Sequence, residues 1–334
     1  MPVMLMAAED DALTNALVER TLRALRRTSA ASHGALAIVV DPVLADPVAF
    51  EPILEEALVS GRIHRQALPP IHADIDPDKA PYLLHVPDEP AAERLVNLSV
   101  RMAIKESLGL LGDTYLGRSI CAWFCSNDAP AIMAKRLATV ARVVNDRGQV
   151  WPLRLWDPRV FWHLPRVLQD LQWQVVRTEL AGWCTLSPMN ELVALQPNAG
   201  ALPATGALPL RFDSIRWQTL ERIATINKTL AIGQAWDLMP TPAQAQRIDA
   251  LLLRCQALGF EREQDGCVFA ATALTCHERF DEHPRVREAL RRAEAEDHAL
   301  STALDGFDDA FWAELATGAW LRDTNSTSST PASP

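Results

Sequence analysis

The stretch NAGALPATGALP (residues 198–209) divides the sequence into two parts with different apolar patterns. Before it, short strand-like runs alternate with helical patterns, and after it the apolar residues recur only at helical spacing. The stretch itself is rich in Gly, Pro and Ala and has no periodicity, which is typical of a linker. We therefore predict an α+β protein. It has a mixed α/β lobe with a central sheet over 1–198, a linker over 199–210, an all-helical lobe over 211–322 and a disordered tail over 323–334.

Three segments of the first part are predicted to be buried strands. They are GALAIVVDP at 34–42, APYLLHVPD at 80–88 and RSICAWFCSN at 118–127. The first ends at Asp41-Pro42 and the second at Pro87, because proline cannot donate to a sheet. Asn127 or Asp128 is expected to cap the helix that follows the third. Residues 141–156 predict a hairpin with the turn NDRG, and residues 182–197 predict another strand pair.

The octet LRLWDPRV (residues 153–160) marks the change from this hairpin to a helix. Alternation places Arg154 and Trp156 on the same side of the chain. Asp157 can accept hydrogen bonds from the free N–H groups of the new helix, and Pro158 suits its first position. Pro165 is expected to kink or split that helix.

Arg159 is not explained by capping, because a cation in the first turn is unfavourable with respect to the helix dipole. Two partners for it stay open. One is a carboxylate of the same chain, with Asp157 among the candidates. The other is a carboxylate or carbonyl of a binding partner, held by the planar guanidinium.

The second part shows clear helix boundaries. A helix is predicted from 214 to 236, and another follows with Thr241 as its cap, Pro242 at its first position and Gly259 at its end. Two or three more helices are expected up to about Trp320.

Charge and composition restrict the kinds of partner. The formal net charge of −10 disfavours a general nucleic-acid binder, which needs a basic surface. No apolar run approaches the roughly 18 residues that span a bilayer, and the first residues lack a basic region before an apolar one. Six cysteines agree with a reducing compartment. We therefore expect a cytoplasmic protein that binds neither nucleic acid nor membrane.

No familiar catalytic motif is found in the sequence. The glycines of LGLLGDTYLGRS lack the spacing and the Lys of a phosphate-binding loop, and no Gly-x-Ser-x-Gly is present. The segment CHERFDEHP (276–284) contains His277 and His283, which are suitable metal ligands. Their separation by six residues does not place them on one helical face, so a solvated segment between helices is the favoured interpretation. We predict no catalytic residue, no metal and no cofactor, and hence no enzyme.

Around this octet the chain resembles the effector chaperones, also called adaptors, of the bacterial type VI secretion system. Such proteins have a strand rich in Arg and aromatic residues that leads into Asp-Pro-Arg-Val and an apolar helix. GALAIVVDP looks like the first strand of that family, and Pro81-Tyr82-Leu83 like its Pro-Tyr-Leu segment. The resemblance covers roughly residues 35 to 293, and it departs from the family at Trp123-Phe124, where Trp-Gly is expected. The motif corresponds here to Arg154, Trp156, Asp157, Pro158, Arg159 and Val160.

The resemblance implies a function without catalysis. Adaptors of this family hold a toxin before its export and help to load it onto the spike protein of the secretion apparatus. It implies two partners, a secreted toxin effector and the spike protein. We assign partner binding to Arg154, Trp156 and Arg159, and a structural role to Asp157, Pro158 and Tyr82.

Two other classes of function are compatible with the sequence. An enzyme with a site built from Asp157, Arg159 and His163 would bind an anionic substrate at the start of the helix. An immunity protein would use its acidic charge to block a basic toxin. The enzyme would turn over a substrate by itself, the immunity protein would inhibit its toxin directly, and the adaptor would bind its client outside the catalytic region.

Overall fold

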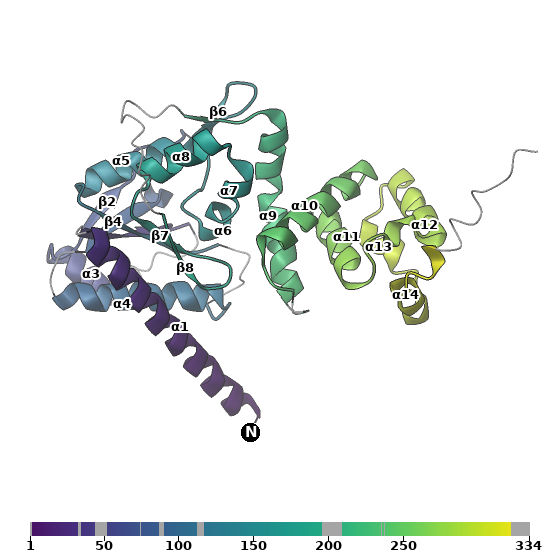
Figure 1. The fold of residues 1–334 in the computed structure, drawn as a ribbon, viewed down its shortest axis with the longest axis horizontal. Coiled ribbons are helices and arrows are strands. Elements are labelled where there is room, and N and C mark those ends of the chain that lie inside the picture. The colour runs from purple at the N-terminus through teal and green to yellow at the C-terminus, as the bar shows by residue number, and fades with distance from the viewer. Residues whose placement is uncertain are drawn as a thin grey trace, which may run out of the picture. The chain divides into compact units, whose positions relative to one another are not determined.

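A six-stranded sheet organises the N-terminal part of the chain, as the computed structural model shows (Figure 1). The chain divides into two compact units, Met1–Leu220 and Glu221–Pro334. The structure describes residues 2–32, 35–43, 52–73, 75–86, 90–111, 117–195, 209–234, 236 and 238–321. Most of the predicted linker and the whole predicted tail lie outside the described residues. The last residue of that linker, Leu210, begins a strand.

The first unit contains every strand of the described chain. Its elements, up to the helix in which the two units divide, are α1 (Pro2–Ser32), β1 (Ala35–Val40), α3 (Pro52–Val59), β2 (His64–Ala67), η1 (Pro77–Lys79), β3 (Tyr82–Val86), α4 (Pro90–Ser107), β4 (Ile120–Ser126), α5 (Pro130–Ala141), β5 (Arg142–Val144), β6 (Val150–Pro152), α6 (Pro158–Phe161), α7 (Leu164–Val167), α8 (Asp170–Glu179), β7 (Trp183–Leu186), β8 (Leu192–Ala194), β9 (Leu210–Arg211) and α9 (Ser214–Gln234).

The strands of the large sheet lie in the order β2-β3-β1-β4-β7-β8, and all their pairings are antiparallel. β1 pairs with β3 on one side and with β4 on the other. The register places Ile38 opposite Leu84 of β3 and opposite Trp123 of β4. β1 is apolar throughout and β4 is apolar up to its last residue, Ser126, because helices cover both faces of the sheet.

One face of the sheet packs against α1 and α4. Ile38 and Val40 of β1, Tyr82 of β3 and Trp123 of β4 share a core with apolar residues of these two helices. Alternation directs these side chains to the same face. Each such fully buried apolar side chain contributes about 2 kcal/mol through the hydrophobic effect.

The opposite face carries α5 and α6. Helix α5 contacts β2 and β3, and its apolar residues Met133 and Leu137 are fully buried. The ring of Phe161 in α6 lies 5.8 Å from that of Trp183 in β7, which meets Phe124 of β4 edge-on. The helix that starts at the Asp-Pro-Arg-Val motif is thereby fixed to the sheet.

A second, three-stranded sheet has the order β6-β5-β9. The hairpin β5–β6 matches the predicted one, with Val144 opposite Val150. β9 pairs in parallel with β5 and joins the segment before α9 to the hairpin. Sequence patterns missed β9 and β2, because strands of two and four residues carry too little periodicity.

The second unit is helical throughout its described residues. Thr241 caps α10 by accepting a hydrogen bond from the N–H of Gln244, and Gly259 follows the helix with a φ of +91°, as predicted. The α+β fold class with a helical C-terminal part is therefore confirmed. The elements after α9 are α10 (Pro242–Ala257), α11 (Glu263–Thr275), η2 (Phe280–Glu282), α12 (Pro284–Ala295), α13 (Leu300–Leu304) and α14 (Asp309–Ala316).

Two local expectations have different outcomes. Pro165 splits its helix as predicted, because α6 ends at Phe161 and the new helix α7 begins at Leu164. The predicted cap of α5 is wrong: the N-cap position is Ala129, which offers no side-chain hydrogen bond. Asp128 instead forms an ion pair with Arg136 at 2.9 Å.

Among the described residues, no helix is both long enough and apolar enough to span a bilayer.

Candidate functional site

The Asp-Pro-Arg-Val motif begins with a helix cap. Asp157 has extended backbone angles, and its Oδ1 accepts a hydrogen bond of 2.9 Å from the N–H of Arg159. Its carbonyl accepts from the N–H groups of Val160 and Phe161. Pro158 occupies the first helical position, where no N–H is needed. Asp157 is thus the N-cap of α6, and Pro158 is its first residue.

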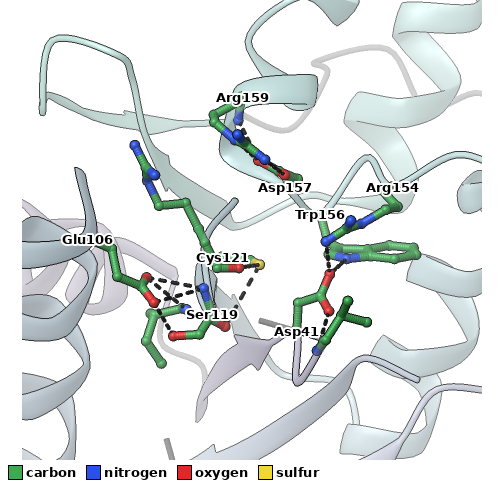
Figure 2. A network of polar contacts seen from close by, with 11 residues as sticks. Asp41, Glu106, Ser119, Cys121, Arg154, Trp156, Asp157 and Arg159 are labelled. Carbon is green, nitrogen blue, oxygen red and sulfur yellow. Dashed lines mark hydrogen bonds and ion pairs between the residues drawn. The ribbon is translucent and has the colours of Figure 1, made fainter. Parts of the chain in front are cut away.

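The side chain of Arg159 folds back onto the same carboxylate (Figure 2). Its Nε lies 3.1 Å from Oδ1 of Asp157 and its Nη2 lies 2.7 Å from Oδ2. Burial alone would raise the pKa of Asp157, but the hydrogen bonds and the charge of Arg159 outweigh it and lower that pKa. Of the two partners left open for Arg159, the intramolecular carboxylate is therefore present.

A second buried carboxylate, Asp41, binds the residues just before the motif. Its Oδ2 accepts from Nη2 of Arg154 at 2.6 Å and from Nε1 of Trp156 at 2.7 Å (Figure 2). Its Oδ1 accepts from the N–H of Val43. Its own N–H donates to the carbonyl of Ser119, which continues the pairing of β1 with β4. Asp41 thus ties residues 154–156 to the end of β1.

A third carboxylate, Glu106 at the end of α4, holds the start of β4. Its oxygens accept from the N–H groups of Ser119 and Ile120 and from the hydroxyl of Ser119. Burial raises the pKa of Glu106 despite these hydrogen bonds.

The half-buried side chain of Arg118 lies within the electrostatic influence of Glu106 and Asp157. Burial and the nearby charge of Arg159 lower its pKa, whereas Asp157 and Glu106 act in the opposite direction. Three carboxylates and three arginines thus gather here, so their formal charges balance. We call this set the polar network; it consists of Asp41, Glu106, Arg118, Arg154, Asp157 and Arg159.

Cys121 is the only thiol that Figure 2 draws beside the polar network. Burial raises its pKa well above the usual range, and the surrounding carboxylates add to the effect. Its Sγ is 3.2 Å from the carbonyl oxygen of Arg118. A protonated, buried thiol is a weak nucleophile, and this one packs as a small apolar side chain.

The three residues predicted to bind a partner differ in exposure. The side chain of Arg154 is 40 % exposed and that of Arg159 18 %, whereas Trp156 as a whole is 2 % exposed. A partner could reach the guanidinium of Arg154 without any rearrangement. Because Trp156 is buried, it would affect partner binding only indirectly, by positioning Asp41 and Arg154.

Tyr82, predicted to be structural, is fully buried in β3 opposite Val40 of β1. The guanidinium carbon of Arg65 lies 3.8 Å above the centre of its ring, in the geometry of a cation–π contact. Tyr82 thereby packs the second segment of the resemblance against the first.

Two of the three residues of the enzyme alternative pair with each other, and the third has a partner of its own. Asp157 and Arg159 bind each other. His163 is fully buried, and its Nδ1 accepts a hydrogen bond of 2.9 Å from Nε of Arg166.

The segment CHERFDEHP joins α11 to α12, and its acids pair with arginines. Glu278 lies 3.0 Å from Arg247, and Glu282 lies 2.8 Å from Arg254. In the part of the chain that the structure describes, no three His, Cys, Asp or Glu residues are grouped as metal ligands.

Sequence patterns identified Asp157, Pro158 and Arg159 but missed the acceptor Asp41, although the same Asp-Pro dipeptide marks both positions. They also missed Glu106 and Arg118, for which the sequence offers no pattern. In comparisons with known proteins, no family model, no curated protein and no solved structure matches this chain.

Proposed function

We propose that this protein is a cytoplasmic adaptor of a type VI secretion system that binds a toxin effector and helps to load it onto the spike protein. One observation carries the proposal: the three segments on which the family resemblance depends are neighbours around Asp41. Asp41 ends the first segment, and Tyr82 of the second pairs with Val40. Arg154 and Trp156 of the third donate to the carboxylate of Asp41.

The hydrogen bonds of Asp41 with Arg154 and Trp156 join residues more than a hundred positions apart in sequence. Short motifs occur by chance in many chains, but here strand pairing and hydrogen bonds join the three segments directly. The convergence supports the interpretation that the segments form one inherited structural unit, as the resemblance requires.

The geometry also favours one contact point for the client. Asp41 holds the guanidinium of Arg154 from the protein side, and 40 % of that side chain faces solvent. Val43, which donates its N–H to Asp41, is itself 54 % exposed. An oriented cation beside an exposed apolar side chain suits a client segment that carries a carboxylate next to an apolar residue.

The test uses the tagged full chain as bait in its native cell, with mass spectrometry of the proteins that co-purify. We expect one large secreted toxin and a spike component. Direct titration of the purified toxin should then give a dissociation constant at or below about 1 μM, with binding mapped outside the catalytic region. Absence of toxin or spike binding at micromolar concentration would contradict the proposal.

A pair of variants tests the contact point. Arg154→Lys keeps the charge, but its ammonium cannot bind Asp41 and a client carboxylate in the same forked geometry. We expect about tenfold weaker client binding, equivalent to about 1.4 kcal/mol. The matched control is Arg147→Lys, at an exposed arginine of the β5–β6 turn, with unchanged affinity. Inhibition of the toxin's catalysis by the wild-type chain would favour the immunity protein instead.

A further inference from the structure

Two histidines, one at the start of α12 and one in the segment between α11 and η2, accept hydrogen bonds from the backbone through Nδ1. His283 is the N-cap of α12, and its Nδ1 lies 3.3 Å from the N of Arg285. The Nδ1 of His277 lies 3.1 Å from the N of Arg279. Nδ1 can accept only when it carries no proton, so the contact of His283 requires a neutral imidazole.

The rings of the same two histidines pack against aromatic residues near the C-terminal end of the described chain. The ring of His283 meets Phe311 of α14 at 5.0 Å and Trp320 at 5.3 Å, both edge to face. The ring of His277 meets Trp320 at 5.7 Å. Phe311 and Trp320 are buried, so these contacts contribute to the packing of α14 on α12.

The charges around His283 come from three elements. On α12, Arg285 places its guanidinium carbon 4.6 Å from the centre of the Phe311 ring. On α14, Glu314 favours the charged imidazole. Asp281 and Glu282 of η2 directly precede His283, and both pair with Arg254. Burial and Arg285 lower the pKa of His283 and outweigh Glu314.

We propose that His283 forms a proton-sensitive latch that holds α14 and Trp320 against the start of α12 and releases them on acidification. Protonation converts Nδ1 of His283 from an acceptor into a donor that faces a backbone N–H. It also places a second cation beside Arg285 at the ring of Phe311. Both changes weaken the contacts that hold α14.

The direction of the pH effect follows from proton linkage. A histidine whose pKa is lower in the folded state binds more protons when unfolded, so its contribution to stability is lost as the pH falls below the ordinary value of 6.5. The latch is therefore closed at neutral pH and opens as the pH falls below the ordinary value of 6.5.

The experiment measures amide hydrogen exchange by mass spectrometry on the full chain at pH 7.5 and pH 5.5, as protection relative to intrinsic rates. We expect protection of peptides from 305–321 to fall about tenfold at pH 5.5, while α10 (Pro242–Ala257) changes less than about twofold. Equal protection of 305–321 at both pH values would overturn the proposal.

The double variant His277→Asn and His283→Asn tests the mechanism, because asparagine accepts from the backbone but does not titrate. It should show no acid-induced loss of protection, and a loss as large as in the wild type would overturn the proposal. The control His298→Asn, at an exposed histidine beside Glu296, should retain the loss. If the double variant is not folded at pH 7.5 by circular dichroism, His283→Asn alone serves, with at least half of the loss abolished; full retention would overturn the proposal.

Discussion

Asp41-Pro42 and Asp157-Pro158 are the same dipeptide in two different structural roles. Asp41 ends a strand, and its partners Arg154 and Trp156 lie 113 and 115 residues away in sequence. Asp157 starts a helix, and its partner Arg159 is two residues away. Both aspartates are almost completely buried.

The comparison separates a contact that stabilises local structure from one that stabilises tertiary structure. The Asp157–Arg159 pair forms once the local turn forms, and it secures one short helix. The contacts of Asp41 form only after β1, β4 and the β5–β6 hairpin have assembled, so they stabilise the tertiary structure. We therefore expect loss of Asp41 to be the more damaging change.

The largest effect is expected for Asp41→Ala. The change leaves the indole N–H of the buried Trp156 without an acceptor and removes the charge partner of Arg154. We expect a loss of about 3 kcal/mol in the free energy of unfolding, measured by urea denaturation. A loss below about 1 kcal/mol would show that the two donors find other acceptors, and the proposed tertiary role would fail.

Asp157→Ala should cost less, about 2 kcal/mol, from the helix cap and the ion pair together. Because the contact is local, Asp157→Ala combined with Arg159→Ala should be barely less stable than Asp157→Ala alone. Urea denaturation of the two single variants and the double variant measures this coupling. Additive losses would show that Arg159 stabilises the fold through another residue.

The pH dependence of Asp157→Asn separates the charge from the cap. Asparagine can still cap the helix, so only the charge interaction with Arg159 is lost, about 1 kcal/mol at pH 7. The pKa of Asp157 lies below its ordinary value of 3.8, so its charge stabilises the fold above that pH and the benefit is lost as the pH falls through the folded pKa. The stability difference from the wild type should shrink on acidification below pH 3.8, and a constant difference would contradict this account.

The smallest effects on stability are expected when the arginines are replaced by lysine. Arg159→Lys loses one of two parallel contacts with Asp157, about 1 kcal/mol, and Arg154→Lys retains a single contact with Asp41, about 0.5 kcal/mol. Client affinity should show the reverse order, since Arg154 is the more exposed. Thermal unfolding and client titration of both variants give the comparison. Weaker client binding in Arg159→Lys than in Arg154→Lys would place the client contact at Arg159 instead of Arg154.

Sequence patterns were sufficient wherever the structure depends on a few consecutive residues. The cap at Asp157, the split at Pro165 and the cap at Thr241 involve contacts within four residues, so their stereochemistry can be inferred from residue type. The apolar runs of β1, β3 and β4 were also sufficient to predict strands. The predicted cap of α5 was wrong because Asp128 pairs with Arg136, eight residues away in sequence, and so does not reach the free N–H groups.

The sequence by itself determined most of the order of strands and helices, the α+β class and the helix cap at Asp157. Alternation placed Arg154 and Trp156 on one side, but only the tertiary structure decided that both donate to Asp41. It also decided the pairing of β9 with β5 and the ring contacts of Trp320 with His277 and His283. The physical reason is that these contacts close long loops between segments far apart in sequence. Which distant segments meet depends on how the sheet and helices pack, and residue spacing along the chain does not specify it.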